Sequence, residues 1–115
     1  MQQTVTAFDR EEMLERLGGD VELLHDVLEV FLEECPKMMD EVTAAISGAD
    51  ADAVRRAAHS MKGALLNISA NAAAEEAKAL EQLGADARLD ESSSVLRRLQ
   101  TEVDRLQQAL ADHAS

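Results

Sequence analysis

The stretch Ala57-Ala58-His59-Ser60-Met61-Lys62-Gly63-Ala64-Leu65-Leu66 has the pattern of an amphipathic helix. At about 100° per residue, the apolar side chains between positions 54 and 68 form one broad face. His59 points almost directly away from the middle of that face. Around it fall Asp52, Arg55, Arg56, Lys62, Gly63 and Leu66. An exposed imidazole therefore lies among three cations on a chain whose formal net charge is −12.

The neighbours of His59 suit an imidazole that carries an anionic group. Helical side chains lean toward the helix N-terminus, so a side chain at position 63 would lie over the ring. Gly63 has no side chain, which leaves the ring open at a cost of about 1 kcal/mol of helix propensity relative to Ala. Lys62 leans back beside the ring, and its ammonium can meet a phosphoryl group as a point charge. An imidazole with a cation beside it and no cover is suited to carry an anionic group such as phosphoryl.

The run His-Ser-Met-Lys-Gly resembles the His-x-x-Lys-Gly core of histidine phosphotransfer (HPt) domains. Other positions that match the family in order are Phe8-Asp9 with Leu14, Leu17-Gly18-Gly19-Asp20, Phe31-Leu32-Glu33, Ala57-Ala58-His59, Asn67-Ile68 and Leu80-Glu81. The chain departs from the family at Leu66 and Ser69, where many members have small residues, and at Glu81, where some have glutamine. Apart from these positions, the resemblance covers nearly the whole chain.

This resemblance implies that His59 is the phosphorylated residue and that Lys62 and Gly63 support it. It implies as partners the receiver domains of response regulators and a sensor (hybrid) histidine kinase. The receiver would supply the metal ion and the acid pocket, so we expect no cofactor and no metal in this chain. The expected activity is that of a stoichiometric phosphocarrier in a two-component phosphorelay, which is not an enzyme and has no ATP site.

The residues around His59 also predict a docking surface for the partner protein. Leu66 is apolar on the wet face, and Gly63 and Ala70 are expected to flatten the surface beside it. Arg55 and Arg56 can pair with Asp52 at i+3 and i+4, and an acidic partner could compete for them.

The apolar spacing predicts an all-α fold. Helices are expected at residues 8–17, 21–46, 51–69, 72–83 and from 91 or 92 to 111. Four long amphipathic helices with short connections predict an up-down antiparallel four-helix bundle, with the short first helix as an extra N-terminal element. We expect residues 1–115 to form a single domain, with residues 1–7 as a loose lead-in.

Local signals set the expected helix ends. Asp20, Asp50 and Asn71 are the predicted N-caps, and Gly84 is expected to end the fourth helix. Pro36 lies inside the second helix, but the apolar stripe keeps its phase across it. One kinked helix is therefore favoured over two.

Composition excludes several classes of function. The strong negative charge argues against nucleic acid or an anionic membrane as a partner. No segment approaches the roughly 20 apolar residues that span a bilayer, and the N-terminus has no signal-peptide core. The single cysteine, Cys35, cannot form an internal disulfide and is expected in the core. We expect a cytoplasmic monomer.

The other candidate sites in the sequence are weaker. His25 and His113 lack the cationic, uncovered surroundings of His59, so we expect each of them to be a solvated surface residue or a satisfied structural group. No His, Cys, Asp or Glu spacing is typical of a metal site, and no glycine-rich loop suits a nucleotide. One alternative is an adaptor bundle that binds partners through its helix faces without phosphorylation. Another is the phosphotransfer module of a larger sensor kinase, although the early Met1 mildly favours a free-standing protein.

Overall fold

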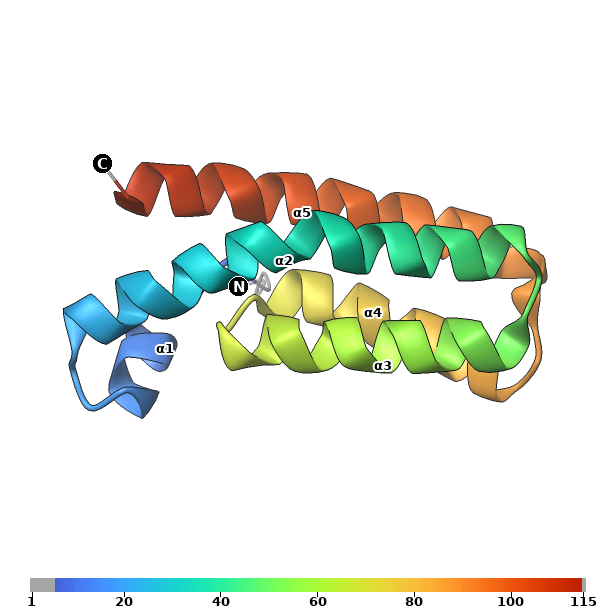
Figure 1. The fold of residues 1–115 in the computed structure, drawn as a ribbon, viewed down its shortest axis with the longest axis horizontal. Coiled ribbons are helices and arrows are strands. Elements are labelled where there is room, and N and C mark those ends of the chain that lie inside the picture. Colours follow the sequence, from blue (N-terminus) through green and yellow to red (C-terminus); the bar gives the residue numbers. More distant parts are fainter. Residues whose placement is uncertain (1–5, 115) are drawn as a thin grey trace, which may run out of the picture.

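The computed structural model describes residues 6–114, with side chains through residue 112, and this part of the chain contains no strand. Its elements are α1 (Arg10–Arg16), α2 (Val21–Ser47), α3 (Ala51–Asn67), α4 (Asn71–Ala85), a 3₁₀ turn η1 (Leu89–Glu91) and α5 (Ser92–Ala114). Figure 1 shows the four long helices running alternately in opposite directions. The all-α, up-down antiparallel bundle is confirmed. Residues 1–5 of the expected lead-in, and the side chain of His113, lie outside the described part.

Aspartates begin the first three helices. Side-chain oxygens of Asp9, Asp20 and Asp50 accept hydrogen bonds from backbone N–H groups three residues later, at 3.0–3.1 Å. Each such cap typically contributes about 1 kcal/mol, because it satisfies a donor that has no partner within the helix. The predicted caps Asp20 and Asp50 are confirmed. Because Asp9 is also a cap, Phe8 precedes α1 instead of opening it, and its ring is buried.

The turn between α3 and α4 differs from the prediction. α3 ends at Asn67, two residues early, because Ser69 takes a left-handed conformation with φ of +57°. The predicted N-cap Asn71 is wrong: it is the first residue of α4, and Ala70 occupies the cap position without a side-chain hydrogen bond. Ser69 and Ala70 are fully buried, so this turn is packed inside the molecule.

The prediction of one continuous helix across Pro36 is confirmed. The helix is continuous from Val21 to Ser47, and in Figure 1 its first half is inclined to its second half. A proline removes one helical hydrogen bond and clashes with the preceding turn, which commonly bends a helix. Pro36 is exposed and the buried stripe of α2 continues on both sides of it.

Gly84 has a different role from the predicted one. It lies inside α4, which continues to Ala85, and it is buried. A Cβ at this position would lie 2.6 Å from the backbone nitrogen of Arg55 and 2.8 Å from the carbonyl oxygen of Ala51. Gly84 therefore lets α4 approach the backbone of α3 closely. A sequence can show that a glycine follows a helical pattern, but not that a neighbouring helix touches it.

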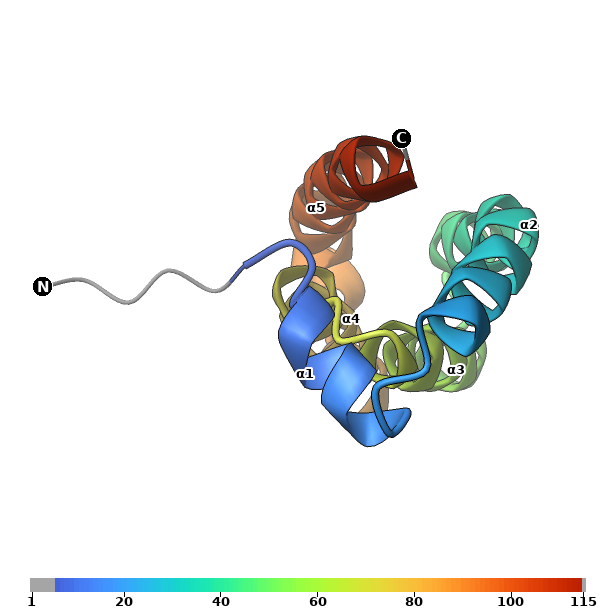
Figure 2. The same ribbon diagram turned by 90° about the vertical axis from the view of Figure 1, so that its left-hand side faces the viewer.

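The core lies between α2, α3, α4 and α5, and Figure 2 shows these helices end-on around it. Cys35 is part of this core, as expected, and burial raises the pKa of its thiol. The largest fully buried side chains are Met13, Leu24, Met61, Leu65, Ile68, Leu80, Leu99, Leu106, Val42 and Val54.

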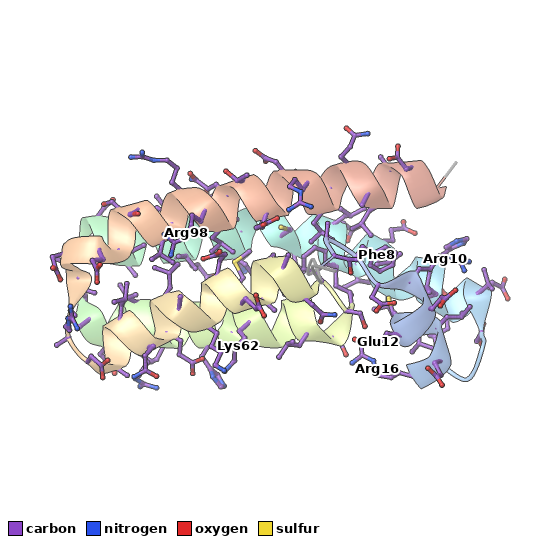
Figure 3. The ribbon with its side chains drawn as sticks, turned by 180° about the vertical axis from the view of Figure 1, so that it is seen from behind. Phe8, Arg10, Glu12, Arg16, Lys62 and Arg98 are labelled. Carbon is purple, nitrogen blue, oxygen red and sulfur yellow. The ribbon has the colours of Figure 1, made fainter. Side chains whose placement is uncertain are left out.

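The short helix α1 covers the end of the bundle where α3 meets α4 (Figure 2). The backbone N–H of Asp9 donates to the carbonyl oxygen of Ser69 at 3.0 Å. The Arg16 guanidinium donates to the carbonyl oxygens of Leu66 and Asn67, both at 3.0 Å, and to Ser69 Oγ at 2.6 Å. Figure 3 labels Arg16 at this end of the molecule. α1 is thereby fastened to the α3–α4 turn.

Candidate functional site

His59 lies near the middle of α3 on the face opposite the core. Its side chain is 64% exposed, whereas the nearby Ala58 and Met61 are fully buried. The amphipathic pattern of residues 51–67 accounts for this placement, because burying the apolar face turns position 59 toward solvent. The structure therefore places the ring where another molecule can reach it.

One carboxylate from α4 connects the two functional side chains of α3. Glu81 Oε2 lies 2.7 Å from His59 Nδ1, and Glu81 Oε1 lies 2.6 Å from Lys62 Nζ. The hydrogen bonds from Lys62 and then from His59 hold the pKa of the Glu81 carboxyl below its ordinary value of 4.5. Glu81 is therefore ionised at neutral pH. Figure 3 shows Lys62 on the side of the molecule where α3 and α4 run next to each other.

This contact determines which ring nitrogen faces outward. An ionised carboxylate can only accept a hydrogen bond, so His59 Nδ1 must carry the proton. The tautomer is thus assigned from the hydrogen-bond network. In the neutral ring the other nitrogen, Nε2, keeps its lone pair, and no described residue forms a hydrogen bond to it. The exposed ring therefore presents a nucleophilic atom to solvent.

The surface next to His59 is open at Gly63. A Cβ at position 63 would have no other atom within 4 Å outside its own helix backbone and chain neighbours. A methyl group there would not touch the His59 ring. Only a side chain longer than that of alanine at position 63 could cover the ring in the way that the sequence pattern suggests. Nothing inside the protein requires glycine at this position. Leu66, one turn further along the same face, is 45% exposed, as the docking prediction requires.

The two arginines preceding His59 share one carboxylate. Arg55 and Arg56 contact Asp52 at 2.9 and 3.0 Å, and all three side chains are substantially exposed. The hydrogen bond from Arg55 and the charges of both arginines hold the pKa of the Asp52 carboxyl below its ordinary value. Exposed pairs of this kind contribute little to stability, so both arginines stay available to a partner.

Ala70 does not belong to this surface. Its side chain is fully buried under the α3–α4 turn, so the prediction that it flattens a docking patch beside Leu66 is wrong. The prediction assumed that α3 continues through residue 69, which would have placed Ala70 on the exposed side. The left-handed Ser69 redirects the chain into the bundle instead.

A groove between α2 and α3 borders the site. It has a volume of about 790 Å³, and His59 and Arg56 line it together with Glu41 and Ala44 of α2. The opposite side of His59 is closed by Glu81 and Lys62. The exposed imidazole therefore lies at the margin of this groove.

No second site of comparable chemistry is present in residues 6–112. His25 is exposed on α2, and among the described residues no carboxylate or lysine contacts its ring as Glu81 and Lys62 do beside His59. No three His, Cys, Asp or Glu side chains in this range are arranged to hold a metal ion. None of the described helices is both long enough and apolar enough to cross a bilayer.

Glu81 was not among the residues that the local sequence pattern singled out as a site. It follows His59 by 22 positions and lies on a different helix. Spacing within one helix cannot reveal a contact between two helices. The signal for it was the family resemblance, in which Glu81 matches a position where some members have glutamine.

Comparison with known proteins assigns the family. The Hpt domain family model matches residues 26–109, from within α2 to within α5. The chain belongs to the Hpt domain family, whose members act in phosphorelays as phosphocarriers without an ATP site of their own. Searches of curated proteins and of solved structures gave no match. α1 and the first turn of α2 lie outside the matched segment.

Proposed function

We propose that His59 accepts a phosphoryl group from an aspartyl phosphate on one receiver domain and passes it to the aspartate of another. The observation that carries the proposal is the engaged Nδ1 of an otherwise exposed ring. This contact leaves Nε2 free to act as nucleophile. The partners proposed are receiver domains and a sensor histidine kinase, in the cytoplasm, with the chain acting as a monomeric single domain.

The transfer step balances without any proton leaving the site. The Nε2 lone pair of the neutral ring forms a bond to phosphorus. The bond between phosphorus and the aspartate oxygen breaks, and its electron pair returns to the carboxylate of the receiver. His59 keeps its proton on Nδ1 throughout, so the product is a phosphorylated imidazolium paired with Glu81. The reverse sequence of bond changes delivers the phosphoryl group to the next receiver.

Lys62 supports this step by its charge. The Lys62 side chain is 25% exposed, and Glu81 holds its ammonium on the same side of α3 as His59. A phosphoryl group adds negative charge at the ring, and a nearby ammonium lowers the cost of bringing that charge in. Arg55, Arg56 and Leu66 would contact the receiver, while the open surface at Gly63 lets it approach the ring.

The test is chemical phosphorylation with phosphoramidate, a small histidine phosphodonor. Intact mass is recorded before and after an acid step for the wild-type protein, His59→Gln and the matched control His25→Gln. We expect one acid-labile phosphate in the wild type and in His25→Gln, and none in His59→Gln.

Equal labelling of His59→Gln would refute the proposal. The alternative, an adaptor bundle that acts without phosphorylation, would then become the better interpretation. It predicts that His59→Gln still binds every partner and keeps the biological function.

A further inference from the structure

The last turn of α3 carries Leu66 and has no positive charge of its own. Leu66 and Asn67 are the final two residues of α3, and no basic residue lies in this last turn. Carbonyl groups at a helix C-terminus lack helical N–H partners, and a cation is favourable there because the helix dipole is negative at that end. Gly63, one turn earlier, lowers the helix propensity of the segment. The turn that presents Leu66 to solvent therefore needs support from outside α3.

Arg16 of α1 supplies this support. Its guanidinium donates to the carbonyl oxygens of Leu66 and Asn67, both at 3.0 Å, and to Ser69 Oγ at 2.6 Å. One side chain of α1 thus caps the end of α3 and brings the charge that α3 lacks there. The partners are 50–53 positions apart in sequence, so these contacts exist only while α1 is docked on the bundle.

Ser69 keeps its contact with Arg16 in an unfavourable backbone conformation. The residue is fully buried and has a φ of +57°. Glycine adopts this left-handed conformation freely, whereas a residue with a side chain pays for it in steric strain. What serine offers here and glycine would not is the hydroxyl that accepts from Arg16. Strain of this kind persists where surrounding contacts fix it, and it is concentrated at functional sites.

We propose that Arg16 is a positioning residue, through which docked α1 holds Leu66 in the orientation that a receiver domain binds. The proposal rests on the proposed function, because it assigns Leu66 to the receiver contact. When α1 undocks, the last turn of α3 loses its cap, and the affinity for the receiver falls with the fraction of molecules in which the turn is ordered. α1 lies outside residues 26–109, so this control belongs to a part of the chain that the family model does not cover.

A pair of matched variants isolates the contact. Arg16→Met removes three hydrogen bonds and keeps an unbranched side chain of similar length. Arg10→Met makes the same change on the same helix, where the Arg10 side chain forms no hydrogen bond or ion pair with another described residue. Figure 3 shows Arg16 on the side of α1 toward the bundle and Arg10 away from it. Circular dichroism verifies that both variants are folded.

The first measurement is binding, by isothermal titration calorimetry. The probes are the purified receiver domains of all response regulators encoded in the same genome, and the tightest binder is used for the variants. Leu66 is 45% exposed, so burying the rest of its surface should make Leu66→Ala bind about fivefold more weakly. Arg16→Met should bind about threefold more weakly, and Arg10→Met as tightly as the wild type.

A double variant distinguishes positioning from general stability. If Arg16 acts through Leu66, adding Arg16→Met to Leu66→Ala should cause no further loss of affinity, because the side chain that Arg16 positions is already gone. If Arg16 contributes only to the stability of the bundle, its effect on binding should be the same with and without Leu66.

The second measurement separates docking from chemistry. Phosphoramidate is small and needs no docking surface, so it should label His59 at the same rate in Arg16→Met, Arg10→Met and the wild type. Transfer from phosphorylated Arg16→Met to the receiver, at receiver concentrations below saturation, should be about threefold slower than from the wild type. A slower phosphoramidate reaction in Arg16→Met would place the effect at His59 and overturn the proposal.

The outcomes separate this proposal from the proposed function. If the wild type binds no receiver or takes up no phosphate on His59, both fail. If it does both, and Arg16→Met binds the receiver as tightly or its effect adds fully to that of Leu66→Ala, the proposed function stands and the role of Arg16 is wrong.

Ser69→Gly decides the question if Arg16→Met does not fold. It removes one of the three partners of Arg16 at a position whose backbone conformation suits glycine. Ser69→Gly should bind the receiver more weakly than the wild type although it remains folded. Equal affinity would overturn the proposal.

Discussion

Two glycines inside helices should respond to alanine with opposite signs. Gly63 and Gly84 both lie in helix interiors, where replacement of glycine by alanine typically gains about 1 kcal/mol through helix propensity. At Gly63 the new methyl group meets nothing within 4 Å, so the full gain is expected. At Gly84 it would lie 2.6, 2.8 and 2.9 Å from three backbone atoms of α3. Backbone atoms cannot move aside as a flexible side chain can.

The size of the effect follows from these distances. Carbon atoms in good contact are about 3.5–4.0 Å apart, so the methyl group at 84 overlaps its neighbours by close to 1 Å. Overpacking typically costs about 1–3 kcal/mol, and three backbone contacts place Gly84→Ala at the upper end. After the propensity gain, we expect Gly84→Ala to be less stable than the wild type by about 2 kcal/mol. Gly63→Ala should be more stable by about 1 kcal/mol.

Urea unfolding followed by circular dichroism measures both variants, and linear extrapolation gives the free energies of unfolding. The melting temperature should fall by about 8 °C for Gly84→Ala and rise by about 4 °C for Gly63→Ala. Gly84 lies one turn beyond Glu81, so separating α3 from α4 there should also weaken the hydrogen bond between Glu81 and His59 Nδ1. Nitrogen-15 NMR of the His59 ring would report this change. If the two alanine variants were equally stable, the close approach of α4 to α3 would be refuted.

Three further perturbations test other parts of the structure. Arg16→Met removes three hydrogen bonds to the α3–α4 turn and leaves the buried Ser69 hydroxyl without its donor, so thermal unfolding should show a loss of about 2 kcal/mol; an unchanged melting temperature would mean that the contact is not formed in solution. Pro36→Ala should raise the free energy of unfolding by up to about 3 kcal/mol, since the helix already passes through this position; a loss of stability would show that the bend is needed for packing. The pKa of Glu81 is lower in the folded protein than its ordinary value, so its ionised form contributes stability above that ordinary value, and the contribution is lost as the pH falls through the folded pKa. The stability difference between wild type and Glu81→Gln in urea titrations should accordingly shrink between neutral pH and pH 3, and a constant difference would contradict the ion pair.

The long helices and their caps could be predicted because their signals are local. Apolar residues at helical spacing identified the buried stripe of each helix, and Asp20 and Asp50 marked two helix starts. The same periodicity placed His59 on the exposed face. These features depend on residues within one or two turns of each other, which is the range over which sequence spacing specifies direction.

The errors lie where two segments that are distant in sequence meet. Ser69 adopts a left-handed conformation, which a sequence usually signals by glycine or asparagine. Without that signal, the apolar spacing extends α3 too far and places Ala70 on the surface. Gly84 was interpreted as a helix end because its contact with Arg55 belongs to another helix. The local pattern did not identify Glu81 for the same reason. Its partners lie on α3, and only the packing of α4 against α3 brings its carboxylate into contact with them.

The fastening of α1 to the α3–α4 turn implies a hierarchy of opening motions. α1 has seven residues, of which only Met13 is buried, and it lies outside the segment that the family model matches. A segment with so little buried surface opens at a lower free energy than the rest of the protein. Amide hydrogens of α1 should therefore exchange with solvent when this helix undocks. Those in the middle of α3 and α4 should exchange only through global unfolding. The N-terminal segment then behaves as a latch on a bundle that keeps His59 and Glu81 together whether the latch is open or closed.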